Sequence, residues 1–122
     1  LDYGLTTFVE ENSYWRSLCH AWSAHPALEF LQRILGVTPT APGFARVTIQ
    51  PHLCGLSHAA GSVCTPHGPI EVAWQIHAGQ FTLKINAPAG LDLTVIAPDS
   101  AATTRRFSGA TFPETFTLAA RS

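Results

Sequence analysis

The sequence contains little charge: 12% of its 122 residues are Asp, Glu, Lys or Arg, and the formal net charge is −1. It has no run of Lys or Arg, so it lacks the positive patch that binds a phosphate backbone or an anionic membrane surface. It also lacks an apolar run of about 18 residues, the length that a membrane-spanning helix requires. We therefore expect neither a nucleic acid nor a membrane as a partner.

Cysteine is scarce and methionine is absent. Cys19, Cys54 and Cys64 are an odd number of thiols without the C-x-x-C spacing of zinc sites. We expect them to be reduced and packed, with a bridge between Cys54 and Cys64 as the alternative. The histidines also lack H-E-x-x-H spacing, so the sequence predicts no metal site and no cofactor.

The chain begins with Leu1 instead of Met, and no targeting or signal-peptide pattern follows. We interpret it as the C-terminal piece of a longer protein, which leaves its localisation open. Its hydrophobic content of 46% is sufficient for the core of one domain.

The spacing of hydrophobic residues changes once along the chain, from a helical period to alternation. A helix over residues 26–35 is predicted, with Ser23 as a candidate N-cap, Pro26 in the first turn and Gly36 as a left-handed terminator. Its apolar face comprises Ala27, Leu28, Phe30, Leu31, Ile34 and Leu35. Residues 37–42, rich in Pro and Thr, are predicted to form a stiff linker.

After the linker, apolar and polar residues alternate over short runs. The alternating apolar positions are Val47, Ile49, Val63, Ile70, Val72, Trp74, Ile76, Phe81, Leu83, Ile85, Leu91, Leu93, Val95, Phe112, Phe116 and Leu118. Gly- and Pro-rich turns separate them, and the clearest hairpin signal joins 70–76 to 80–86 at Ala78-Gly79. This pattern predicts a mainly β domain over 43–122, an antiparallel, jelly-roll-like β-sandwich preceded by one helix.

Residues 6–26 combine carboxylates, imidazoles, indoles and a guanidinium in a chain that is otherwise poor in charge. Alternating aromatic faces and hydrogen-bonding groups are typical of a pocket for a polar, ring-shaped ligand such as a sugar. Arg16 is expected to pair with Glu10 or Glu11 and to lower a carboxylate pKa. Glu11 is expected on the opposite side of the chain from Glu10, in solvent, and His25 is expected to brace the start of the helix.

Several motifs in this part of the chain occur in an order that is found in one known family. They are Gly4-Leu5-Thr6-Thr7-Phe8-x-Glu10, Ser17-x-Cys19-His20-Ala21-Trp22-Ser23-Ala24-His25-Pro26, Leu35-Gly36-Val37, Pro42-Gly43-Phe44, Pro51-His52-Leu53 and Gly61-Ser62-Val63. Residues 1–90 thereby resemble the C-terminal end of bacterial α-L-rhamnosidases of glycoside hydrolase family 78. The resemblance implies an (α/α)6 catalytic barrel followed by a β-sandwich, so that residues 1–36 are the end of the barrel.

The same resemblance implies site residues. Family members are inverting glycosidases, and the base in their Thr-Thr-x-x-Glu motif corresponds to Glu10, while the general acid lies upstream. The sugar-contacting histidine of the Cys-His-x-Trp-Ser motif corresponds to His20. Val9 stands where family members often have Trp. Trp15 and Trp22 are expected to be apolar platforms for the sugar, although Trp22 is equally compatible with a place in the core.

We therefore interpret the chain as the C-terminal part of a glycosidase that removes terminal α-L-rhamnosyl residues from a glycan or glycoside. It would contribute the base and one sugar contact. The alternative is a non-catalytic β-sandwich module that packs on a barrel or binds carbohydrate weakly. In the first interpretation the chain needs its missing N-terminal part and is inactive alone. Exposed apolar surface along residues 26–35 would then favour self-association.

Overall fold

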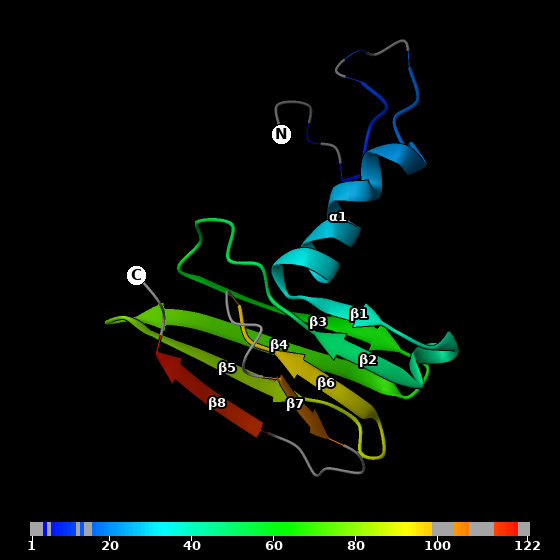
Figure 1. Cartoon of the computed structure of the whole chain (residues 1–122). Helices are drawn as coiled ribbons and strands as arrows, with labels where there is room; N and C mark the ends of the chain where they lie inside the picture. Colours follow the sequence, from blue (N-terminus) through cyan, green and yellow to red (C-terminus); the bar gives the residue numbers. More distant parts are fainter. Residues whose placement is uncertain are drawn as a thin grey trace.

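The computed structural model describes residues 4, 6–11, 13, 16–98, 104–107 and 114–119. Two four-stranded sheets face each other, and a helical segment projects from them (Figure 1). The first sheet has the order β1 (Val37–Pro39), β2 (Arg46–Ile49), β6 (Asp92–Ile96), β7 (Thr104–Phe107). The second has the order β3 (His58–Thr65), β4 (Gly68–His77), β5 (Gln80–Asn86), β8 (Glu114–Ala119). The predicted β-sandwich preceded by a helix is confirmed.

One strand pair departs from the antiparallel pattern. β2 and β6 are parallel, with Val47 opposite Leu93 and Ile49 opposite Val95. Parallel neighbours require a long crossover between them. Here the chain leaves the first sheet after β2, builds β3, β4 and β5 of the second sheet, and then returns as β6.

The core lies between the sheets and is made of the alternate residues that the period predicted. Buried side chains include Val47, Ile49, Ile70, Val72, Trp74, Phe81, Leu83, Ile85, Leu93 and Val95. The hairpin of β4 and β5 is confirmed, and Ala78 and Gly79 have φ values of 48° and 71°. Positive φ at both central residues is the mark of a type I′ turn. Phe112, also predicted to be a strand position, lies outside the described residues.

The predicted linker 37–42 begins with a strand of the sandwich. β1 pairs antiparallel with β2, Val37 lies opposite Ile49, and the Val37 side chain is buried. Pro39 ends the strand, as expected for a residue that cannot donate to a ladder and is confined to sheet edges. The short helical turn η3 (Pro42–Phe44) follows and leads into β2.

The helical segment is continuous through η1 (Ala21–Ala24), α1 (His25–Glu29) and η2 (Phe30–Ile34). Pro26 lies in the first turn of α1, as predicted, and Gly36 ends the segment with φ of 80°. The N-cap prediction at Ser23 is wrong. Ser23 is already inside η1, whereas a cap needs an extended residue, and Ala24 precedes α1 without a side-chain bond. No helix in the described ranges has the length and apolar character needed to cross a bilayer.

The three cysteines are free, as predicted, but they are exposed instead of packed. Cys64 alternates with the buried Val63 and so faces outward from β3. Cys54 lies in a turn with φ of 48°, and Cys19 lies in the loop before the helix. Their exposure is decided by alternation along the strand and by position in loops. The hydrophobic character of a thiol does not predict it.

Trp74 connects the sandwich to the helical segment. Its side chain is buried, and its indole Nε1 donates a hydrogen bond of 2.8 Å to the carbonyl oxygen of Ile34. The last carbonyls of a helix have no partner within the helix, so this bond satisfies one of them. Leu35 is buried in the same core, whereas Leu28 and Phe30 are exposed. The C-terminal end of the helical segment is therefore anchored, and its N-terminal half projects away from the sheets.

We expect Trp74→Phe to lower the free energy of unfolding by about 1–3 kcal/mol, because the Ile34 carbonyl then lacks its donor. Urea denaturation followed by circular dichroism measures the change. Ile85→Val is the matched control, since it removes core atoms without a hydrogen bond and typically costs about 0.5–1.5 kcal/mol. If Trp74→Phe costs less than this control, the bond does not contribute to stability.

Candidate functional site

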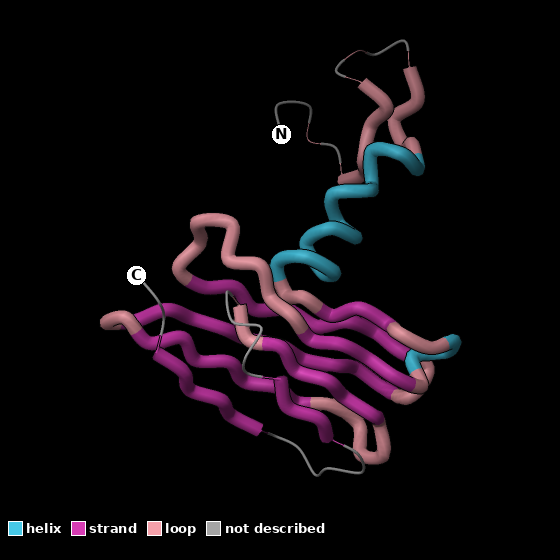
Figure 2. Tube along the Cα trace, viewed as in Figure 1, coloured by secondary structure: helices cyan, strands magenta, loops and turns pink. Residues whose placement is uncertain are grey.

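The polar stretch before the helix folds back on itself as a two-sided loop. Three hydrogen bonds join its sides: Glu10 N–H to the Ser17 carbonyl (2.9 Å), His20 N–H to the Phe8 carbonyl (2.7 Å), and the Thr7 hydroxyl to the Leu18 carbonyl (2.6 Å). Residues 7–10 therefore run alongside 17–20, which brings Glu10 and His20 together. Figure 2 shows this loop beyond the N-terminal end of the helical segment, away from the sheets.

Both oxygens of the Glu10 carboxylate have partners. Oε1 forms an ion pair with the Arg16 guanidinium. Oε2 accepts a hydrogen bond of 3.3 Å from the Ser17 amide and lies 3.8 Å from Nδ1 of His20. The Glu10 side chain is 11% exposed, whereas the Arg16 side chain is 53% exposed. Glu10 is thus sheltered within the loop, and the guanidinium covers it from the solvent side.

These contacts decide the charge of the carboxyl group. Burial raises the pKa of Glu10, but it is outweighed by the hydrogen bonds from Arg16 and the Ser17 amide and by the charges of Arg16 and His20. The pKa of Glu10 is therefore lowered below its ordinary value. The Glu10 carboxyl group therefore loses its proton more readily than that of an ordinary glutamate.

Arg16 was predicted to pair with Glu10 or Glu11, and it pairs with both. Nε of Arg16 lies 3.7 Å from Oε1 of Glu11, and the Ser13 hydroxyl donates to the same oxygen at 3.0 Å. Glu11 is exposed, as expected. The prediction that the two carboxylates lie on opposite sides of the chain is wrong, because the loop curves around Arg16 and presents both to one guanidinium.

His20 and Trp22 form the aromatic part of the site. Their ring centroids are 4.0 Å apart with an interplanar angle of 49°, and Trp22 is 64% exposed. Trp22 is therefore not a core residue. His20 is partly buried, and its Nδ1 faces a carboxylate instead of the backbone carbonyl expected for a purely structural histidine. Trp15 lies outside the described residues.

His25 lies at the start of the helix and contacts it, as the sequence suggested. It is the first residue of α1, and its Nε2 lies 3.6 Å from Oε1 of Glu29 one turn later. Arg33 completes the row through a bond of 3.2 Å from Nε to Oε2 of Glu29. Such exposed pairs contribute only a few tenths of a kcal/mol each, so they support the helix without building a binding site.

Large apolar side chains are exposed on the loop and on the helical segment. This exposed apolar set comprises Phe8, Leu18, Trp22, Leu28 and Phe30, each at least 43% exposed. It includes the exposed surface predicted along residues 26–35.

The Ser17 amide is a site group that the sequence did not reveal. A backbone N–H has no side-chain signal, and its direction depends on how the loop closes. The described part of the chain holds no cluster of three or more His, Cys, Asp or Glu side chains with the geometry of a metal site.

Residues 36–110 match the family model described as the bacterial alpha-L-rhamnosidase C-terminal domain. An alpha-L-rhamnosidase from Alteromonas sp. (strain LOR) is 36% identical over 70 residues, which are 57% of this chain and 8% of that protein. The chain thus spans a small fraction of the length of this curated relative.

Solved structures with a similar fold belong to alpha-L-rhamnosidases. The Streptomyces avermitilis structure, in complex with L-rhamnose, has a TM-score of 0.75 at 22% identity and covers 96% of this chain and 14% of that one. The Aspergillus terreus structure has a TM-score of 0.73 at 22% identity, covering 88% and 12% of the two chains. The Dictyoglumus thermophilum structure has a TM-score of 0.68 at 19% identity, covering 95% and 16%.

Proposed function

Since the chain belongs to the family of bacterial α-L-rhamnosidase C-terminal domains, we propose that it is the C-terminal part of a glycoside hydrolase that removes terminal α-L-rhamnosyl residues. The observation that carries this proposal is the sheltered carboxylate of Glu10 beside His20, with the exposed indole of Trp22 against the same imidazole. In this proposal residues 1–36 end a helical catalytic domain, 37–42 lead out of it and contribute β1 to the sandwich, and 43–122 form the rest of the sandwich.

Glu10 is the proposed general base of an inverting reaction. Inversion requires a carboxylate that takes a proton from water, and an acid about 6.5–9.5 Å away that protonates the leaving oxygen. Oε2 of Glu10, with its longer contacts of 3.3 and 3.8 Å, is the oxygen we assign to the water. Arg16 holds Oε1 and keeps the group ionised, which a base must be. The acid would come from the preceding part of the chain.

His20, Trp22 and Trp15 are the proposed sugar-binding residues. Nδ1 of His20 faces Glu10, so its Nε2 is the atom available for a sugar hydroxyl. The exposed face of Trp22 offers an apolar platform for ring C–H groups. Trp15 is assigned a second platform from the sequence alone.

The exposed apolar set supports the proposal that this chain belongs to a larger protein. Phe8, Trp22 and Phe30 would be covered by the helices of the preceding catalytic domain. Exposed apolar patches of this kind drive association in water. In the isolated chain the same surface would favour self-association.

The test is hydrolysis of p-nitrophenyl α-L-rhamnoside by the complete enzyme and by the 122-residue chain. We expect the complete enzyme to release rhamnose whose anomeric configuration, followed by NMR during the reaction, is inverted. The chain alone should release none, because Glu10 supplies one of the two carboxyl groups that inversion needs. Retention of configuration would contradict the proposed mechanism, and turnover by the chain alone would contradict the divided site.

A further inference from the structure

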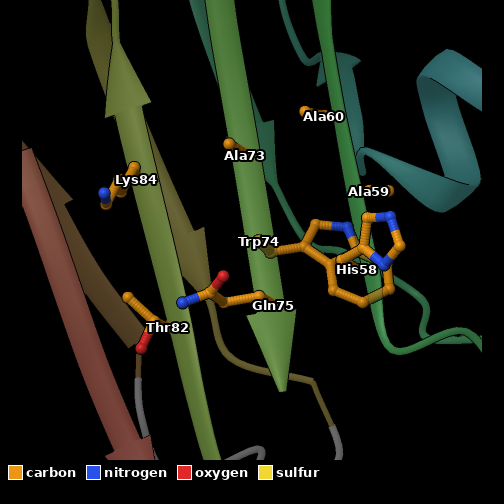
Figure 3. Close-up of a pocket in the computed structure, with 8 residues that line it drawn as sticks. All are labelled: His58, Ala59, Ala60, Ala73, Trp74, Gln75, Thr82 and Lys84. Carbon is orange, nitrogen blue, oxygen red and sulfur yellow. The ribbon is translucent and has the colours of Figure 1, made fainter. Parts of the chain in front are cut away.

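The outer face of the β3–β4–β5–β8 sheet carries a hollow of about 180 Å³ (Figure 3). It lies on the sandwich, whereas the loop that contains Glu10 and His20 lies beyond the N-terminal end of the helical segment (Figure 2). Ala60 on β3 and Ala73 on β4 form its floor and are directly opposite each other in the ladder. Two adjacent methyl groups among longer outward side chains leave a depression with an apolar base.

Polar side chains border this floor on two sides. His58, Gln75 and Thr82 form one row across three strands, because His58 pairs with Gln75 and Gln75 pairs with Thr82. Lys84 pairs with Ala73 and closes the end of the floor. Figure 3 shows all four side chains around the two alanines. The hollow therefore combines an apolar base with hydrogen-bonding groups at its edge.

The hollow also carries a positive charge for which the described residues provide no ion pair. Lys84 is the one Lys or Arg that lines it, and no Asp or Glu does. Among the described residues, no ion pair within 4 Å includes Lys84. Glu71, on the same face of β4, instead accepts a hydrogen bond of 2.9 Å from Asn86. An anionic group at this end of the hollow would complement the ammonium.

We propose that this hollow is a second saccharide site, specific for an acidic sugar unit such as a hexuronate. The C–H face of the ring lies on Ala60 and Ala73, as apolar sugar faces do on apolar surfaces. The ring hydroxyls bond to the His58, Gln75 and Thr82 side chains. The carboxylate meets the Lys84 ammonium. The site binds its ligand without any part in hydrolysis, so it is independent of the role assigned to Glu10.

The experiment is an NMR titration of the isotope-labelled chain, with glucuronate as the probe and glucose and L-rhamnose for comparison. We expect glucuronate to shift the amide signals of Ala60, Ala73 and Thr82, with weak affinity as befits an open site. Glucose should shift the same signals with lower affinity. Lys84→Gln should weaken glucuronate binding about two- to fivefold, the range of an exposed ion pair, and leave glucose unaffected.

Two further variants separate the hollow from general surface effects. Ala73→Leu fills the floor of the hollow and should abolish the shifts. Thr82→Val removes one hydroxyl at nearly constant volume and should weaken binding. It replaces Ala73→Leu as the test if that variant does not fold. Arg46→Gln removes the same charge from β2 of the other sheet and should leave the affinity unchanged.

Shifts that do not localise to these strands, or that persist in Ala73→Leu, would overturn the site. Equal affinity for glucuronate and glucose would overturn its assignment to acidic sugars. Neither result depends on rhamnoside hydrolysis, so failure here is distinguishable from failure of the proposed enzymatic function.

Discussion

Replacing Glu10 by Gln is expected to lower rhamnoside turnover by the complete enzyme about 10²- to 10⁴-fold, the usual contribution of a general acid or base. The amide keeps the size of the side chain and can still accept a hydrogen bond from the Ser17 N–H. It cannot take a proton from water, so the loss should appear in kcat with little change in KM. Steady-state kinetics with p-nitrophenyl α-L-rhamnoside measure both constants.

Glu11→Gln is the matched control for this prediction. It makes the same chemical change one residue later, on an exposed carboxylate that shares Arg16. We expect it to leave kcat essentially unchanged. Near-normal turnover in Glu10→Gln would contradict the assignment and would favour the alternative of a non-catalytic module.

Arg16 provides a second check through the pH profile of the same enzyme. The base works only when Glu10 is deprotonated, and the Arg16 hydrogen bond and charge lower the pKa of Glu10. Arg16→Gln removes both, while burial still raises the pKa, so the acid limb of the kcat/KM profile should move to higher pH. A limb that stays in place would mean that another group controls it.

Gly36→Ala is expected to lower the free energy of unfolding of the chain by about 2–4 kcal/mol. Part of the loss is the left-handed conformation, since Gly36 has φ of 80°. The rest is a collision, because a Cβ here would lie 2.2 Å from the carbonyl carbon of Gln50 and 2.4 Å from the nitrogen of Pro51. These are backbone atoms, and Gln50 N–H already donates to the Gly36 carbonyl at 2.9 Å. The two segments are therefore held close together at this point.

Gly90→Ala separates the two causes. Gly90 has φ of 87°, but nothing lies within 4 Å of its added Cβ. It should therefore lose only the left-handed contribution of about 1–2 kcal/mol. Urea denaturation of both variants gives the comparison, provided that the m values agree. Equal losses would show that the close approach of Gly36 to Gln50 does not matter.

Local features of the chain were readable from the sequence because they depend on neighbouring residues. The period of two over 70–76 and 80–86 and the turn at Ala78-Gly79 specify a hairpin whichever sheet it joins. Gly36 ends the helical segment because a residue with a Cβ resists its φ. Arg16 was expected to pair with Glu10 or Glu11, which are close to it in the chain, and it pairs with both.

The tertiary structure decided what depends on residues far apart in sequence. β1, a strand of three residues, is too short to show a period, and the parallel pairing of β2 with β6 follows from the path of three intervening strands. Trp74 donates to Ile34, forty residues earlier, and Ala60 meets Ala73 only through the ladder register. Whether Trp22 was core or surface was equally undecided, because burial depends on what packs beside the helical segment. The hydrophobic pattern and the turn residues act over a few positions. Sheet order and burial depend on contacts between segments that are far apart in sequence.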